Sequence, residues 1–201
     1  MLTMISSLFS VMSVNAKEKK RKKEIPLVEL QTPRLKIVPL SKEAFSKKLN
    51  SDFDGEEFHE AMCELQERAA ADKPCRFAWY TNRLIFRLED GAYIGSVAFM
   101  NSPEKDPDKV GLIEIGYSVK EEYRSQGYMT EAVNAMCDWA LAQPKVYGMI
   151  AGVKDDNPAS IRVLEKCGFV MTDHSDALSL QVWKKIPEGK QPLRFFRRHF
   201  G

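Results

Sequence analysis

The chain has 201 residues, of which 44% are hydrophobic and 29% are charged, and its formal net charge at pH 7 is +2. This length fits one domain with a full hydrophobic core, and so small a charge surplus argues against nucleic acid as a partner. The four cysteines lack C-x-x-C spacing and the three histidines are scattered, which disfavours zinc sites, disulfide frameworks and histidine-based catalytic triads. We therefore expect a cytoplasmic protein that holds no metal.

Two tails are expected to flank a folded domain at residues 31–187. Residues 1–30 contain a moderately apolar stretch that precedes a basic run, KEKKRKK. Although Val14-Asn15-Ala16 resembles a cleavage site, a secretory signal carries its lysines in front of the apolar run, and this stretch is too short and polar to span a bilayer. Residues 188–201 mix arginines with phenylalanines. We expect both tails to be solvated, with no stable membrane insertion.

The first half of the domain combines strands with two helices. An alternating apolar pattern predicts a strand over residues 35–40, and Ser41 is a suitable N-cap for a short helix that follows. Apolar residues at helical spacing predict a second helix over residues 56–71. Two strands, at residues 83–88 and 93–100, then flank a turn of sequence EDG.

The second half continues with a strand, a helix, a strand, a helix and a final hairpin. The expected ranges are residues 110–119, 128–143, 146–153, 158–167, 169–172 and 178–186. Asn157 suits the N-cap of the later helix, Pro158 its first position and Gly168 its end. This order predicts an α/β or α+β fold, in which helices cover both faces of a mixed sheet.

The segment between the strand at 110–119 and the helix at 128–143 has the features of an anion site. A helix N-terminus leaves several backbone N–H groups unpaired and carries the positive end of the helix dipole, which suits phosphate or pyrophosphate. Arg124 adds a cation, and Gly127 lets the backbone approach an anion closely. The loop has neither a Walker A pattern nor G-x-G-x-x-G, which disfavours kinase, NTPase and Rossmann functions.

Residues 124–129, RSQGYM, resemble the [QR]-x-x-G-x-[GA] acetyl-CoA loop of the GNAT acetyltransferases. The wider run from Glu114 to Ala132 resembles the Rim-type branch, which includes ribosomal-protein-alanine N-acetyltransferases. Residues 157–169 resemble the N-x-x-S…K-x-G-F segment of the same family, and the order of elements agrees. The resemblance implies a GNAT fold with a mixed, mostly antiparallel twisted sheet. It also implies transfer of an acetyl group from acetyl-CoA to a primary amine.

The resemblance assigns the cofactor-binding residues by position. Backbone groups of Tyr117, Ser118 and Val119 would pair with the pantetheine arm. The pyrophosphate would be held by amides of Arg124, Ser125, Gln126, Gly127, Tyr128 and Met129. Asn157 and Ser160 would contact the far end of the pantetheine or the phosphates, and Asn157 can serve as a helix cap at the same time.

Two positions depart from the family pattern. Met129 stands where glycine or alanine is usual, although its backbone amide is still available. Leu164 stands where many members have a tyrosine that protonates the departing thiolate. That role is left open between Tyr117, Tyr128, an ordered water and no dedicated acid.

Glu114 is the expected catalytic base. On a strand it shares a face with Gly116 and Ser118, and a carboxylate near the amine can remove its proton. The alternative for Glu114 is a solvent-facing or structurally paired side chain. Glu131 is a weaker candidate, because the helix dipole already favours a carboxylate in the first turn. Cysteines 137 and 167 occupy apolar helix positions and are expected in the core.

The expected partners are acetyl-CoA and an amine acceptor. The acceptor is either the N-terminal α-amine of a protein or a small amine, and a homodimer is left open. A different class of function, a non-catalytic acyl-CoA-binding sensor or scaffold, is the alternative, since the usual tyrosine acid is missing. Function resides in the site and not in the fold, so the geometry of these residues decides between them.

Overall fold

The computed structural model describes residues 25–49, 56–103 and 111–190, so most of both expected tails lies outside the described residues. The α-helices are α1 (Lys42–Leu49), α2 (Glu56–Ala71), α3 (Phe77–Tyr80), α4 (Tyr128–Leu141) and α5 (Pro158–Lys166). The strands are β1 (Leu30–Gln31), β2 (Leu35–Pro39), β3 (Arg83–Arg87), β4 (Tyr93–Phe99), β5 (Leu112–Val119), β6 (Gly148–Lys154), β7 (Val170–Ser175) and β8 (Leu180–Lys185). Every strand and helix predicted from the sequence is present, close to its expected bounds.

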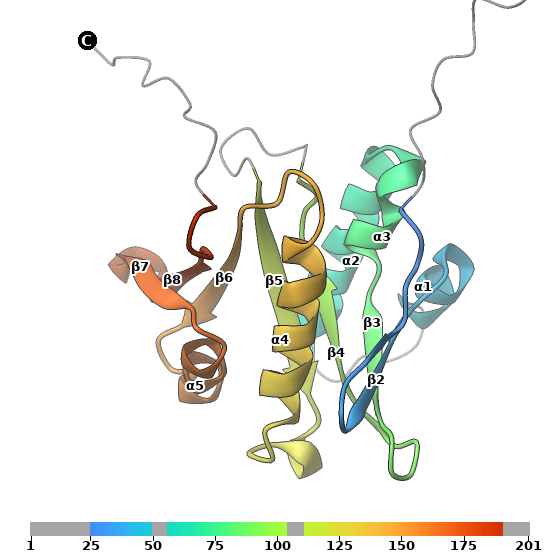
Figure 1. Cartoon of the computed structure of the whole chain (residues 1–201), viewed down its shortest axis with the longest axis horizontal. Helices are drawn as coiled ribbons and strands as arrows, with labels where there is room; N and C mark the ends of the chain where they lie inside the picture. Colours follow the sequence, from blue (N-terminus) through green and yellow to red (C-terminus); the bar gives the residue numbers. More distant parts are fainter. Residues whose placement is uncertain (1–24, 50–55, 104–110, 191–201) are drawn as a thin grey trace, which may run out of the picture.

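The described strands form one sheet in the order β1-β2-β3-β4-β5-β6-β8-β7. Strands β5 and β6 pair in parallel, and the other neighbouring strands pair antiparallel. Figure 1 shows α4 in front of this sheet and α2 behind it. The predicted fold, a mixed and mostly antiparallel sheet with helices on both faces, is confirmed.

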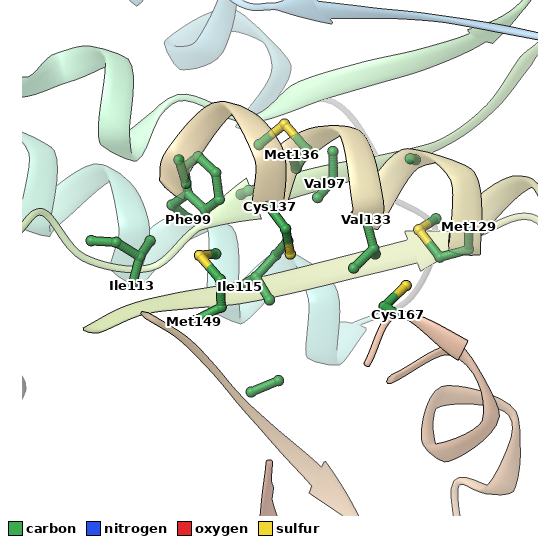
Figure 2. Packing of buried hydrophobic residues seen from close by; sticks show 14 of the residues in the cluster. Val97, Phe99, Ile113, Ile115, Met129, Val133, Met136, Cys137, Met149 and Cys167 are labelled. Atoms are coloured by element: carbon green, nitrogen blue, oxygen red, sulfur yellow. The ribbon is translucent and has the colours of Figure 1, made fainter. Parts of the chain in front are cut away.

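Helix α4 is fixed on the sheet by the apolar stripe predicted for it. Its buried residues are Tyr128, Met129, Ala132, Val133, Met136, Cys137 and Ala140. Figure 2 shows Val133 and Cys137 between the helix and β5, beside Ile115. Burial of one large apolar side chain stabilises a fold by about 1.5–3 kcal/mol. The stripe therefore holds the N-terminus of α4 in a defined place relative to β5.

Arg83 is a charged side chain inside this core, with only 2% of its surface exposed. Its guanidinium stacks on the rings of Phe99 and Trp139, 5.2 Å from each centroid. It also donates hydrogen bonds to the carbonyl oxygens of Ala78 and Thr81, at 2.6 and 3.2 Å. Burial lowers the pKa of Arg83 to about 10, so the group stays charged at neutral pH and supplies donors to the C-terminal end of α3.

Strands β5 and β6 are paired along only part of their length. They pair only from Leu112 to Glu114 on β5 and from Gly148 to Ile150 on β6. Beyond these residues β5 remains paired with β4, and β6 remains paired with β8. Figure 1 shows the two strands diverging toward the end of the sheet that carries α5 and the N-terminus of α4. The sheet thus opens in its middle while its outer pairings continue.

Packing at the N-terminal side begins before Gln31, the expected start of the domain. Ile25 and Leu30 already pack against the core, and the N–H of Ile25 reaches the carbonyl oxygen of Cys75 at 3.4 Å. No helix within the described ranges is both long enough and apolar enough to cross a bilayer.

Gly95 of β4 generates a first prediction, because it faces β5 beside the opening. A Cβ at Gly95 would lie 2.3 Å from the carbonyl oxygen of Ser118, whereas one at Gly91 would meet nothing within 4 Å. Gly91→Ala should therefore lower the free energy of unfolding only by the cost of a left-handed residue, about 1–2 kcal/mol. Gly95→Ala should lower it by more, because the backbone of β4 or β5 must move to make room for the Cβ. Urea unfolding of both variants measures this, and equal losses would contradict the close contact.

Candidate active site

An open cavity of about 1150 Å³ lies where β5 and β6 part. Its walls come from these two strands, the loop and first turn of α4, and α5. Ligand clefts commonly hold about 300–1000 Å³, so this space accommodates a long ligand. Of the catalytic and cofactor-binding residues predicted from the sequence, all except Gln126 and the weaker candidate base Glu131 line it. They are Glu114, Tyr117, Ser118, Val119, Arg124, Ser125, Gly127, Tyr128, Met129, Asn157 and Ser160.

The pairing of β5 with β4 decides which backbone groups of β5 face the cavity. The N–H of Lys120 donates to the carbonyl oxygen of Ile94 at 3.0 Å. In an antiparallel pair, hydrogen-bonded and non-bonded positions alternate, so the backbone of Ser118 also bonds toward β4. The backbone groups of Tyr117 and Val119 point the other way, to the side where pairing with β6 has already ended. An extended ligand can therefore pair with them.

The N-terminus of α4 opens onto the same cavity. Its N-cap is Gly127, with φ +80°, which provides no side-chain cap, and Ser125 before it is also left-handed, with φ +60°. The first-turn amides of α4 are thus available to an anion. Helix α5 differs, because Oδ1 of its predicted N-cap Asn157 accepts a hydrogen bond from the N–H of Ser160 at 3.0 Å. The uncapped terminus is the one that the sequence predicts to bind an anion.

Charge around the cavity favours an anionic ligand. The cationic side chains that line it are Lys120, Arg124, Lys154, Arg162 and Lys166, and the carboxylates are Glu114, Glu121 and Glu122. The open end of the cavity is formed by α5 and by the loop before α4, residues 120–127, which we call the α4 loop. The cations outnumber the carboxylates there, although Glu121 and Glu122 also belong to this loop. A cleft lined by an excess of one charge concentrates ligands of the opposite charge.

Glu114 lies at the point where the two strands separate. It is the last residue of β5 that pairs with β6, opposite Ile150. Its N–H donates to Oδ1 of Asn101 at 2.8 Å, and its carbonyl oxygen accepts from the N–H of Met100 at 2.9 Å. Met62 and Met100 line the cavity with it. The backbone of Glu114 is therefore fixed where the pairing of β5 with β6 closes the cavity, which we call its closed end. The half-buried side chain belongs to a partly apolar wall there.

Glu131, the weaker candidate base, is engaged elsewhere. Its Oε1 accepts hydrogen bonds from the hydroxyl of Thr32 at 2.6 Å and from the N–H of Arg34 at 2.9 Å, and its Oε2 accepts one from Nε of Arg34 at 2.7 Å. Although partial burial raises the pKa of Glu131, the bonds from Thr32 and Arg34 lower it overall. This carboxylate is a structural anchor. Thr32 and Arg34 were not predicted as its partners, because they lie 99 and 97 positions from Glu131 in the sequence.

Tyr117 reaches from β5 toward α5, where its hydroxyl donates to the carbonyl oxygen of Ser160 at 3.4 Å. Burial raises the pKa of Tyr117 to about 12. Leu164 is fully buried. Burial also raises the pKa of Cys137 to about 12 and that of Cys167 to about 11. Both cysteines are therefore protonated core residues, as predicted, and not nucleophiles.

His174 braces the turn between β6 and α5. Its Nε2 lies 2.9 Å from Oδ2 of Asp155, and its Nδ1 lies 3.0 Å from Oδ1 of Asp176. Nε2 of Gln181 donates to Oδ1 of the same Asp155 at 3.0 Å. The turn that carries Asn157 into the cavity is thus tied to β7 and β8. Across the described parts of the chain, no three or more His, Cys, Asp or Glu side chains are grouped to hold a metal ion.

Comparison with known proteins identifies the domain type. Residues 34–170, more than half of the chain, match the family described as an acetyltransferase (GNAT) domain. Two Bacillus subtilis proteins are similar. The uncharacterized N-acetyltransferase YjdG is 28% identical over 126 residues, which are 63% of this chain and 71% of that protein. The probable N-acetyltransferase YjcK is 34% identical over 111 residues, 54% of this chain and 55% of that protein.

Solved structures share the fold. An acetyltransferase from Agrobacterium tumefaciens str. C58 superposes with a TM-score of 0.58 at 20% identity, covering 81% of this chain and 96% of that one. A ribosomal-protein-S5-alanine acetyltransferase from Vibrio fischeri has a TM-score of 0.57 at 16% identity, and the match covers 82% of this chain and 100% of that one. A ribosomal L7/L12 α-N-protein acetyltransferase in complex with coenzyme A has a TM-score of 0.56 at 16% identity, covering 81% and 97%.

The brace at His174 predicts a pH-dependent contribution to stability. The hydrogen bond that His174 donates to Asp155, and then the charges of Asp155 and Asp176, raise the pKa of His174. A histidine whose pKa is higher in the folded state than in the unfolded state stabilises the folded protein. The stabilisation is complete at pH values below the pKa of the unfolded state, about 6.5, and is lost as the pH rises through the pKa of the folded state. The urea midpoints of the native protein and of His174→Gln should differ most near pH 6, and the difference should shrink as the pH rises through the folded-state pKa of His174. A difference that is the same at every pH would contradict this.

Proposed function

The chain belongs to the GNAT acetyltransferase family, and we propose that it transfers an acetyl group directly from acetyl-CoA to a primary amine. GNAT enzymes use acetyl-CoA and an amine acceptor. The observation that carries the proposal is the cavity between β5 and β6, which runs from a carboxylate at its closed end to an uncapped helix N-terminus at its open end. One extended ligand with a phosphate-bearing end fits both features.

In this proposal the cofactor follows the wall of β5. Backbone groups of Tyr117 and Val119 pair with the amides of the pantetheine arm, and Ser118 between them lines the wall. The pyrophosphate binds the backbone amides of the α4 loop and first turn, residues 124–129. Because Oδ1 of Asn157 already accepts the N–H of Ser160, Asn157 offers its side-chain NH2 to the cofactor and Ser160 its hydroxyl.

Glu114 acts as the base. The neutral amine attacks the thioester carbonyl carbon, a C–N bond forms and the C–S bond breaks, with the electron pair leaving on sulfur. Glu114, directly or through one water, takes the proton that the amine nitrogen loses. A positioned base of this kind commonly contributes about 10²–10⁴-fold to a rate. The backbone N–H groups of β5 that face the cavity stabilise the charge that develops on the carbonyl oxygen.

The departing thiolate needs no side-chain acid. A thiol has a pKa of about 8.5, whereas that of the Tyr117 phenol is about 12. The Tyr117 phenol is therefore a poor proton donor to a thiolate. The ring of Tyr128 packs against Arg34, whose guanidinium carbon lies 4.5 Å from the ring centroid. We infer that the thiolate departs as such and takes its proton from water, which makes the substitution at Leu164 compatible with turnover.

The acceptor amine approaches Glu114 from the side of α2. Ala61 and Met62 of this helix line the cavity together with Met100, so an amine carried on a small or apolar group fits beside the carboxylate. The N-terminal α-amine of a protein and a small primary amine both meet this description. Each belongs in the test.

Turnover and cofactor binding test the proposal together. Thiol release from acetyl-CoA is measured across N-terminal peptides, amino acids and small amines, and acetyl-CoA binding is measured by calorimetry. We predict that Glu114→Gln lowers turnover about 100-fold or more and changes the Kd for acetyl-CoA less than twofold. Glu165→Gln, an exposed change on α5, is the matched control and should leave both values unchanged.

The outcomes separate the functions. Turnover that survives Glu114→Gln removes Glu114 as the base. Binding of acetyl-CoA without turnover on any amine supports the sensor or scaffold function, and absence of binding contradicts the proposed cofactor site.

A further inference from the structure

Arg34, the residue directly before β2, lies against the α4 loop. Its Nη1 donates to the carbonyl oxygen of Gln126 at 3.1 Å, and its guanidinium carbon lies 4.5 Å from the centroid of the Tyr128 ring. A Cβ built on Gly127 would be 3.5 Å from Nη2 of the same guanidinium. One side chain therefore contacts both Gln126 and Tyr128 and lies beside Gly127 between them. Arg34 is not among the residues that line the cavity.

Glu131 fixes this guanidinium in place. The carboxylate accepts from both the N–H and Nε of Arg34, and it also accepts from the hydroxyl of Thr32. Its side chain is 17% exposed, against 47% for Arg34. Thr32 and Arg34 are thereby tied to the first turn of α4. The arginine also neutralises a carboxylate that would otherwise lie close to a bound anion.

The loop needs such a constraint because Ser125 has an unfavourable conformation. Ser125 has φ +60°, and a left-handed residue other than glycine persists where surrounding contacts hold it, whereas Gly127 adopts its φ of +80° without that cost. Within the loop, Nε2 of Gln126 donates to the carbonyl oxygen of Glu122 at 2.9 Å. Arg34 adds the contact from outside the loop, at the carbonyl of the same Gln126.

We infer that Arg34 is a positioning residue for the anion-binding loop: its guanidinium, oriented by Glu131, holds the Gln126 carbonyl so that the amides of residues 127–129 are aligned for the pyrophosphate. The inference rests on the proposed function, in that the loop binds the cofactor's phosphates. Arg34 acts through the loop backbone and not by contact with the reacting atoms.

Lys36, two residues further along β2, provides the matched control. It carries the same charge, its side chain is 46% exposed, and it pairs with Glu29 at 2.9 Å on the surface. Loss of an exposed pair of this kind has little effect. Lys36→Met therefore removes one charge from the same segment without touching the α4 loop. Arg34→Lys keeps the charge of Arg34 but loses the planar fork that allows simultaneous contact with Glu131 and Gln126.

The experiment compares Arg34→Met, Arg34→Lys and Lys36→Met with the native full-length chain. Hydrogen–deuterium exchange of the amides of residues 126–129 is recorded without any cofactor, and CoA affinity and the KM and kcat for acetyl-CoA are measured alongside. Both Arg34 variants should exchange faster at these amides and should bind CoA about tenfold more weakly, as expected for one charge-assisted hydrogen bond. KM should rise while kcat stays within about twofold, because cofactor binding is affected and chemistry is not.

Two results would overturn the inference. If Arg34→Met behaves as Lys36→Met does in exchange and affinity, Arg34 does not position the loop. If Arg34→Lys matches the native protein, only its charge matters. Exchange is measured without cofactor, so a native protein that binds no CoA would defeat the proposed function while the exchange data still decide whether Arg34 orders the loop.

Discussion

The parting of β5 and β6 beyond Glu114 and Ile150 is the constraint on which the rest of the site depends. Each strand keeps a neighbour on its outer side, β4 or β8, so the sheet stays intact while two inner edges are exposed to the cavity. Backbone N–H and C=O groups in a folded protein need partners. The edge of β5 at Tyr117 and Val119 is therefore suited to an extended ligand with its own amides, and the pantetheine arm of acetyl-CoA is such a ligand.

The two ends of the opening have different chemistry, and each is fixed by a separate part of the fold. At the closed end, bonds to Asn101 and Met100 hold the backbone of Glu114. At the open end, the buried stripe of α4 sets the position of the helix, and Gly127 leaves its N-terminus uncapped. A ligand that reaches both ends carries its reactive group to a carboxylate and its phosphates to backbone amides. In the proposed function, the carboxylate at one end accepts the proton of the amine, and the amides at the other end hold the pyrophosphate.

Local sequence patterns predicted the elements well, and non-local contacts poorly. The stripe of α4 and the cap at Asn157 follow from spacing along one segment, which is why both were predicted. The position of β8 between β6 and β7 and the bond from Arg34 to Glu131 join distant segments, and no periodic pattern records such contacts. The burial of Arg83 was also missed, because an arginine at a strand end reads as exposed until its aromatic neighbours are known.

A crystal structure of the complex with coenzyme A would show whether the cofactor occupies the cavity between β5 and β6. We expect the pantetheine arm between these strands, paired with the backbone of Tyr117 and Val119, and the pyrophosphate at the amides of Gly127, Tyr128 and Met129. Two results would contradict this expectation. Coenzyme A could bind elsewhere, or β5 and β6 could be paired along their full length so that no cavity lies between them.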